Sequence, residues 1–178
     1  MRLSELEETV MENAFSAREF RNALGLFATG VAVATASNHR HRAGITINSF
    51  ASVSLSPPLV LFSAAKTLNS IDTFNDAAGF TINVLSADQA SLSAQFAKAG
   101  EDKWLNVGTA AGKHGGIVIT PCLVSFDCKL HAKCDGGDHV IFIGEVTDII
   151  DGTGDQPLLY FRGSYRDLAP RSGARLAA

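Results

Sequence analysis

The sequence predicts a mainly β protein, an antiparallel barrel that is closed or nearly closed and carries a few helices. Most of the chain after residue 31 follows the period of two that is typical of strands, and only short stretches follow the helical period. The strands do not alternate regularly with helices, and no Gly-x-Gly-x-x-Gly motif is present, which disfavours a parallel nucleotide-binding sheet. Closing the barrel would also remove exposed strand edges.

The composition is that of a globular protein with one domain. Hydrophobic residues make up 46% of the 178 residues and the net charge is -3, so the chain can bury a core and has no basic block to follow a nucleic-acid backbone. The apolar runs are too short to span a bilayer, and the N-terminus lacks the pattern of a signal peptide. We therefore expect a cytoplasmic location, with neither nucleic acid nor a membrane as partner. A flexible arm is expected at 1–15, the domain at 16–168 and a flexible tail at 169–178.

The first predicted helix begins at Ser16. Glu19 follows three residues later, as in a capping box, and apolar residues then recur at helical spacing up to Phe27. Gly30 is expected to end this helix, because glycine is the commonest residue just after a helix.

Further strands and helices follow in order. Strands are expected where apolar and polar residues alternate, or where a short apolar run lies between turn residues. Ser86 with Gln89 repeats the capping signal and opens a helix whose apolar face includes Leu92 and Phe96. The expected strands are 31–36, 45–56, 59–64, 80–85, 124–135, 139–150 and 157–162, a short helix is expected at 67–78, and loops or turns are expected at 37–44, 100–116 and 135–138.

The strand at 45–56 has an unusual polar face. Its odd positions are mostly apolar, whereas its even positions are Thr46, Asn48, Phe50, Ser52, Ser54 and Ser56, with no charge among them. Such a face can hydrogen-bond a neutral polar ligand. It can also lie against a neighbouring subunit or loop, and the spacing alone favours this second interpretation.

The clearest half-buried strand lies at 124–135, where apolar residues at even positions alternate with polar residues at odd positions. The cysteines Cys122, Cys128 and Cys134 are spaced by six residues, with no Cys-x-x-Cys, which is not a metal-binding pattern. On one strand, neighbouring cysteines would lie roughly 20 Å apart at ~3.3 Å per residue, too far for a disulfide. We expect free thiols that act as small hydrophobic residues on the core face.

No motif in the chain names a chemistry by itself. The sequence has no nucleophile elbow, zinc motif or phosphate loop, and no metal site is expected. His39 and His41 lie among arginines in a predicted turn and are expected to be solvated, as is His131 on the polar face of a strand. His114 and His139 lie near glycines in predicted loops, where functional residues often occur.

The segment from Thr46 to Val60 resembles the signature of the short-chain flavin reductase family, which includes the reductase components of two-component flavin monooxygenases. It reads Thr-Ile-Asn-Ser-Phe-Ala-Ser-Val-Ser-Leu-Ser-Pro-Pro-Leu-Val. Other segments match the family in the same order between about Phe20 and Arg166. They are 27–31, 80–85, 92–97, 102–104, 137–139 and 159–165. Each match alone is weak, but the ensemble is specific.

This resemblance implies an FMN-binding split β-barrel of the Greek-key type that forms homodimers. It implies an NAD(P)H-dependent flavin reductase, with FMN or FAD as the flavin and NADH or NADPH as the hydride donor. Reduced flavin would then diffuse to a separate flavin-dependent monooxygenase. The hydride moves directly between the nicotinamide and the flavin, so we expect no side chain to be an obligate acid or base.

The resemblance also implies a set of site residues. The strand around 46–55 and the segment 63–70 would cradle the flavin, and Phe50 and Val53 would provide an apolar wall for its ring. The expected cofactor-binding residues are Thr29, Thr46, Ile47, Asn48, Ser49, Ser52, Val53, Ser54, Leu55, Ser63, Ala64, Lys66, Ser70, Asn83, Phe96, Lys103, His139, Arg162 and Tyr165.

Particular roles follow for some of these residues. Lys66 and Ser70 would hold the flavin phosphate at the start of a helix. His139 would position the nicotinamide, and Arg162 and Tyr165 would border the same pocket. Three positions depart from the family pattern. Ser63 replaces a frequent Cys, Leu68 a frequent hydroxyl residue, and Trp104 the usual Phe.

Two alternative functions remain open from the sequence. The chain could bind flavin as an electron carrier or sensor, without reductase turnover. It could also be an oxidase of the pyridoxamine-phosphate type, which has a similar fold. That second alternative requires basic residues grouped for a second phosphate, and the sequence shows no such group.

Overall fold

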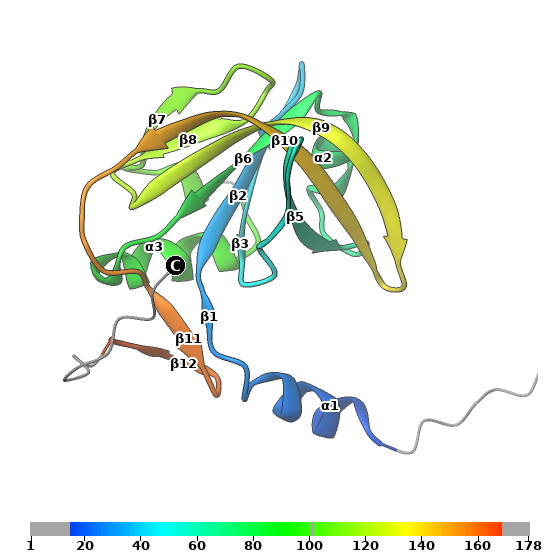
Figure 1. The fold of residues 1–178 in the computed structure, drawn as a ribbon, viewed down its shortest axis with the longest axis vertical. Coiled ribbons are helices and arrows are strands. Elements are labelled where there is room, and N and C mark those ends of the chain that lie inside the picture. Colours follow the sequence, from blue (N-terminus) through cyan, green and yellow to red (C-terminus); the bar gives the residue numbers. More distant parts are fainter. Residues whose placement is uncertain (1–14, 101, 169–178) are drawn as a thin grey trace, which may run out of the picture.

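The computed structural model describes residues 15–100 and 102–168, which fold around one antiparallel sheet (Figure 1). Seven strands pair in the order β3-β2-β6-β9-β10-β5-β4. Their bounds are β2 Ala32–Ser37, β3 Arg42–Ile47, β4 Ala51–Leu55, β5 Pro58–Ala65, β6 Gly79–Val84, β9 Val124–Gly136 and β10 His139–Asp151. Because β3 and β4 are the two edges of this sheet, the barrel is split, and the predicted fold class is confirmed.

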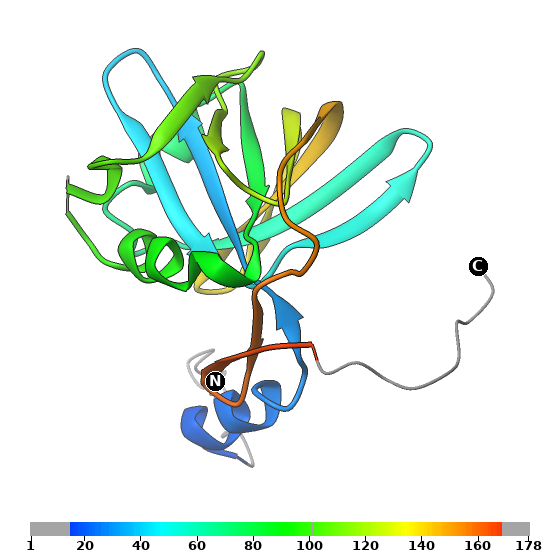
Figure 2. The same ribbon diagram turned by 90° about the vertical axis from the view of Figure 1, so that its left-hand side faces the viewer.

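Smaller elements flank the large sheet. The helices are α1 Ala17–Leu24, α2 Ile71–Asp76 and α3 Ala90–Ala97, with short 3-10 helices η1 Ala87–Gln89 and η2 Asp102–Trp104. The short strands are β1 Thr29–Gly30, β11 Leu159–Phe161 and β12 Ser164–Arg166, which form one sheet, and β7 Gly108–Ala111 and β8 Ile117–Thr120, which form another. In both ribbon views, α1 and the β1-β11-β12 sheet lie below the barrel (Figures 1 and 2).

Both predicted capping boxes are confirmed. Ser16 Oγ accepts a hydrogen bond from Glu19 N at 3.2 Å, and Ser16 N donates to the Glu19 carboxylate at 2.8 Å. Ser86 and Gln89 form the second box, at the start of η1. The first helix ends earlier than Gly30, however. Gly25 caps α1 by donating to the Arg21 carbonyl, and the chain turns away to form β1.

The main core lies inside the large sheet. Phe62, Phe74, Phe80 and Phe142 pack together with ring centroids between 4.9 and 6.0 Å apart, in stacked, tilted and edge-to-face pairs. Each of these rings is almost wholly buried, and such burial stabilises the fold by roughly 2–3 kcal/mol per side chain.

A second core cluster attaches α3 to the barrel. Phe96 of α3 and Trp104 of η2 pack edge to face, with ring centroids 4.9 Å apart. Gly44 of β3 is needed here, because a Cβ at that position would come within 2.5 Å of the Phe96 ring. This close approach seats α3 against β3 and fixes one wall of the cleft described below.

The expected single strand at 45–56 is wrong. The chain leaves the ladder after Ile47, and β4 begins at Ala51 on the opposite edge of the sheet. Ile45 and Ile47 are buried, but Val53 and Leu55 are 47% and 94% exposed. The alternation of apolar and polar residues continues between β3 and β4. It therefore did not reveal that the two strands lie in different surroundings. Figure 2 shows the turquoise β4–β5 hairpin extending to one side of the barrel.

The polar face expected for the strand at 124–135 is also wrong in its first half. Ser125 and Asp127 of β9 are buried. The Asp127 carboxylate accepts hydrogen bonds from Thr81 Oγ1 at 2.9 Å and from Lys113 N at 2.7 Å. Lys113 lies between β7 and β8, which cover this face of β9. Neither of these two strands was expected from the sequence.

The cysteines are free thiols, as expected. Cys122 and Cys128 are buried, and burial raises the pKa of Cys128 to about 12, so this thiol stays protonated at neutral pH. Cys134 is exposed, so its expected place on the core face is wrong. The expected arm at 1–15 and tail at 169–178 lie outside the described residues, apart from Phe15.

Candidate functional site

A cleft of about 1370 Å³ runs along β3. One wall is β3 with the residues that follow it, and a second is the end of β5 with α2 and the residues before it. The end of α3, the residues around η2 and the start of β10 complete the lining. No helix in the described parts of the chain is long and apolar enough to cross a membrane, and no group of three or more His, Cys, Asp or Glu side chains there is arranged to hold a metal ion.

The outer edge of β3 faces this cleft. Because β2 is the one ladder partner of β3 among the described residues, alternate peptide groups of β3 point away from the sheet. The Gly44 carbonyl points outward, since it accepts a 3.1 Å hydrogen bond from Lys103 Nζ. The peptide group of Thr46, two residues further along β3, has the same orientation as that of Gly44. The Thr46 hydroxyl donates to the Ser93 carbonyl at 2.6 Å. The edge therefore supplies neutral hydrogen-bonding groups.

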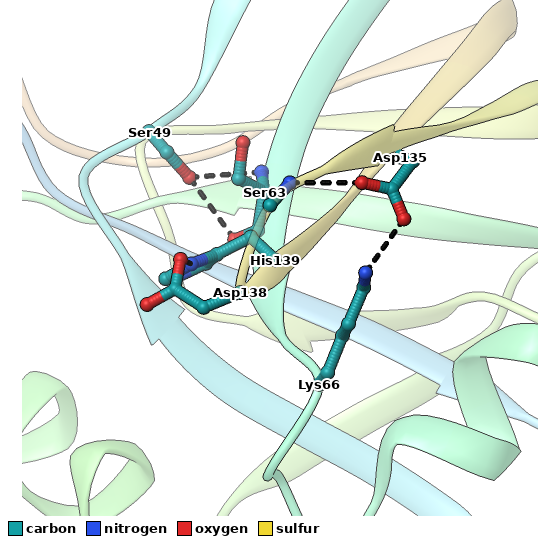
Figure 3. Close-up of polar contacts among 7 residues, drawn as sticks. Ser49, Ser63, Lys66, Asp135, Asp138 and His139 are labelled. Carbon is teal, nitrogen blue, oxygen red and sulfur yellow. Dashed lines mark hydrogen bonds and ion pairs between the residues drawn. The ribbon is translucent and has the colours of Figure 1, made fainter. Parts of the chain in front are cut away.

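A polar corner lies beyond the end of β3. Ser49 Oγ accepts a hydrogen bond from Ser63 N at 3.0 Å and donates to the Ser63 carbonyl at 3.3 Å, which ties the chain after β3 to β5 (Figure 3). His139 Nδ1 lies 2.7 Å from Asp138 Oδ1, and this contact lowers the pKa of Asp138. The His139 side chain stays 43% exposed and lines the cleft.

Lys103 places a cation in the wall of the cleft. Desolvation by burial lowers its pKa, because the charged ammonium has lost part of its hydration. Among the described residues its ammonium forms one hydrogen bond, to Gly44, and no ion pair. An anion bound nearby would replace the lost hydration and stabilise the charged form.

Lys66 and Ser70, the expected phosphate pair, are separated. Lys66 Nζ lies 2.6 Å from Asp135 Oδ2, and the ammonium is directed to that carboxylate, as Figure 3 shows. Lys66 does not line the cleft. Ser70 does, and its hydroxyl makes no capping hydrogen bond at the start of α2.

The structure brings about half of the expected site residues together. Those that line the cleft are Thr46, Ile47, Asn48, Ser49, Ser63, Ala64, Ser70, Phe96, Lys103 and His139. Ser52, Val53, Ser54 and Leu55 lie instead on β4, in the hairpin at the far edge of the sheet. Phe50 also does not wall the cleft, since its ring stacks on Phe126 in the core with centroids 5.6 Å apart.

The remaining expected residues lie outside the cleft. Asn83 is fully buried, and its side chain is held by five hydrogen bonds, to Val33, Thr35, Ile117, Ile119 and Ser125. Both the amide nitrogen and the amide oxygen of Asn83 are therefore already hydrogen-bonded within the protein, and the side chain is not available to a ligand. Thr29, Arg162 and Tyr165 belong to the β1-β11-β12 sheet or its turn. Thr29 Oγ1 is the one buried side-chain polar atom among the described residues without a hydrogen-bond partner.

Several lining residues were missed from the sequence. His41, expected to be solvated, lines the cleft together with Arg40 from the same turn and with Arg42, the first residue of β3. Lys98 and Trp104 line it from the other side. These residues are distant in sequence, and only the packing of α3 against β3 brings them together. A run of two arginines and two histidines in one short turn was the available signal.

The chain belongs to the family described as flavin reductase like domain, whose model matches residues 24–169. A relative, FMN reductase (NADH) SmoA of Agrobacterium fabrum, is 43% identical over 159 residues, covering 89% of this chain and 90% of its own length. The reductase subunit HsaB of a flavin-dependent monooxygenase from Rhodococcus jostii is 35% identical, covering 90% of this chain and 83% of its own.

Solved structures of flavin reductases share the fold. Flavin reductase PheA2 superposes with a TM-score of 0.80 at 39% identity, covering 88% of this chain and 100% of its own. An NADH:FAD oxidoreductase of Streptomyces globisporus, solved with NAD and FAD fragments, superposes with a TM-score of 0.82 at 33% identity, covering 88% of this chain and 94% of its own. The split-barrel assignment therefore rests on relatives that match this chain along most of its length.

Proposed function

We propose that this protein is an NAD(P)H:flavin oxidoreductase that reduces FMN or FAD and supplies the reduced flavin to a separate monooxygenase. One observation carries the proposal. A cleft large enough for a flavin and lined by a neutral polar strand edge lies inside a domain that matches the flavin reductase family along most of its length. Relatives named as NADH-dependent FMN reductases and as monooxygenase reductase components support the same assignment.

The lining fits a flavin ring. An isoalloxazine has carbonyls and an N–H along one side, which peptide groups on the outer edge of β3 and the side chains of Asn48 and Ser49 can pair. Asn48 is exposed and makes no side-chain hydrogen bond within the described protein, so its amide is available. Leu68, which lines the cleft and is only partly buried, can give the apolar contact that a ring face needs.

The reaction needs little acid–base help from the protein. Bound side by side, the nicotinamide supplies a hydride and the flavin accepts it. The residues of the cleft therefore act by holding the two nucleotides in contact, and an alignment within about 3.5 Å contributes several kcal/mol to catalysis. We propose no obligate catalytic acid or base.

His139 is proposed to position the nicotinamide. Its ring is anchored at Nδ1 by Asp138 at the start of β10, where His139 pairs with Ala65 of β5, and it lines the cleft. Anchoring one ring nitrogen fixes the plane of the imidazole and leaves the other edge to contact the carboxamide or ribose of the nucleotide. The Ser49–Ser63 pair next to it fixes the backbone on which the flavin would rest.

We further propose that the protein forms a homodimer. No residue of α1 is buried, although its exposed side chains include Phe20 and Leu24. Leu26 and Phe27 follow at 56% and 76% exposure, and Leu55 on the β4–β5 hairpin is 94% exposed. Large apolar residues exposed on α1, on the segment after it and on the hairpin are typical of a surface covered by a partner.

Titration with FMN, FAD, NADH and NADPH tests the binding part of the proposal. Flavin fluorescence should change with a saturable dependence on protein, and NADH or NADPH should bind the same protein. An electron carrier or sensor without reductase turnover would bind flavin but would not oxidise NADH repeatedly when free flavin is added. Absence of flavin binding at micromolar protein would overturn the proposal.

A further inference from the structure

The two ends of the cleft differ in chemistry. The neutral polar corner, with Asn48, Ser49, Ser63 and His139, lies at one end of β3. The other end of β3 begins at Arg42, six residues before Asn48, which places the two ends about 20 Å apart along an extended strand. A flavin ring at the polar corner therefore does not fill the cleft.

The far end is basic. The described lining residues include four Lys or Arg and two Asp, in a protein whose net charge is -3. Arg40 comes from the turn between β2 and β3, Arg42 is the first residue of β3, and Lys98 follows α3. None of the three forms an ion pair among the described residues. The two acidic residues, Asp72 and Asp76, line the cleft from α2.

Arg40, Arg42 and Lys98 are exposed, and contacts within the protein orient the Arg42 side chain and the turn that carries Arg40. The guanidinium of Arg42 lies over the Trp104 ring, 4.7 Å from its centroid, and Trp104 is itself buried against Phe96. The turn carrying Arg40 is closed by Asn38, whose side-chain oxygen accepts hydrogen bonds from Arg40 N at 3.0 Å and His41 N at 2.8 Å. A stacked guanidinium keeps its N–H donors in one plane, which suits the oxygens of a phosphate.

We propose that this basic end, made by Arg40, Arg42 and Lys98, binds the adenosine diphosphate portion that FAD and the nicotinamide dinucleotides share. The inference rests on the proposed function, because it assigns a substrate portion to the same cleft. It implies that the protein distinguishes a dinucleotide from FMN by phosphate contacts remote from the flavin ring.

The test compares Arg40→Gln/Arg42→Gln with Lys129→Gln, an exposed lysine on β9 outside the cleft. The probes are ADP, FMN, FAD and NADH. We expect the double variant to weaken ADP binding about tenfold, since two charged contacts are lost at a partly exposed site. FMN affinity should change less than about twofold. A weaker FAD affinity assigns the site to the flavin, and a raised KM for NADH assigns it to the nicotinamide nucleotide.

Three results would overturn the inference: ADP that binds wild type and variant equally, an FMN affinity that falls as much as that for ADP, or the same loss in Lys129→Gln. Thermal melting of each variant checks that the fold is intact. Failure of wild type to bind any flavin would overturn the proposed function instead, and the ADP comparison would still decide whether the basic end binds nucleotide phosphate.

Discussion

His139 and Asn48 have separate proposed roles in the cleft: His139 contacts the nicotinamide and Asn48 contacts the flavin. His139 is anchored to Asp138 at the rim, whereas Asn48 lies at the end of the β3 edge with a free amide. The two side chains come from β10 and from the segment after β3, so a change at one does not directly alter the other. Substitutions at these positions should therefore affect different steps.

We predict that His139→Ala impairs use of the nicotinamide more than binding of flavin. Loss of the imidazole removes a contact that holds the hydride donor, so KM for NADH should rise, or hydride transfer slow, by about tenfold while the flavin Kd stays near wild type. Stopped-flow flavin reduction and fluorescence titration measure the two effects. His131→Ala, an exposed histidine on β9, is the matched control. A variant that loses flavin affinity but keeps its NADH kinetics would reverse the assignment.

We predict that Asn48→Trp blocks flavin binding. The indole would occupy the space beside the β3 edge, and the flavin Kd should rise by at least about tenfold because overpacking costs on the order of 1–3 kcal/mol. Thr153→Trp, on an exposed loop outside the cleft, is the control. Unchanged flavin affinity in Asn48→Trp, with normal melting, would show that the ring lies elsewhere.

The burial of Asn83 and Asp127 could not be predicted from the sequence. A polar residue in a strand can be a ligand contact or a buried hydrogen-bonding residue, and only its neighbours decide. The partners of Asn83 lie up to 50 residues away, and those of Asp127 up to 46. Their burial follows from β7 and β8 covering the sheet, which no local pattern indicated.

At the scale of elements, patterns within one segment were informative and patterns between segments were not. Both capping boxes and most strands follow from local spacing. The break between β3 and β4 does not, because the same alternation continues on both sides of it. The flavin signature from Thr46 to Val60 therefore crosses from one edge of the sheet to the other, and only its first part lines the cleft of its own chain.

The tip of the β9–β10 hairpin is tied to the end of β5 by an ion pair with a predictable pH dependence. Hydrogen bonds from Lys66 and from Gly137 N lower the pKa of Asp135 below 3.8. A lowered folded-state pKa means that the stabilisation is present above the unfolded value and disappears as the pH falls through the folded value. We predict that wild type has a slightly higher melting temperature than Asp135→Asn at pH 7, and that the difference disappears as the pH falls through the lowered pKa of Asp135.

Melting curves of both proteins between pH 2 and pH 8 measure this difference. The pair is exposed, so the difference in melting temperature should be small. A gap that widens as the pH falls would contradict the assigned sign.

For the whole molecule, the apolar residues outside the barrel predict assembly. We predict that the wild-type protein sediments as a dimer and that Leu55→Glu shifts it toward the monomer at micromolar concentration. Leu55 is 94% exposed in the single chain, so a charge there costs nothing within the protomer but would be buried in an interface. Leu105→Glu, 66% exposed near η2, is the control. A wild-type protein that sediments as a monomer would contradict the proposed dimer.

If the protein is a flavin reductase, it must reduce free flavin over many turnovers. Anaerobic mixing of a trace of protein with excess NADH and excess FMN measures it directly through the flavin absorbance. We predict that many equivalents of FMN are bleached per protein molecule, at a rate that is proportional to protein concentration and strongly reduced in Asn48→Trp. Bleaching that stops at one equivalent per protein molecule, or that is equal in the variant, would contradict it.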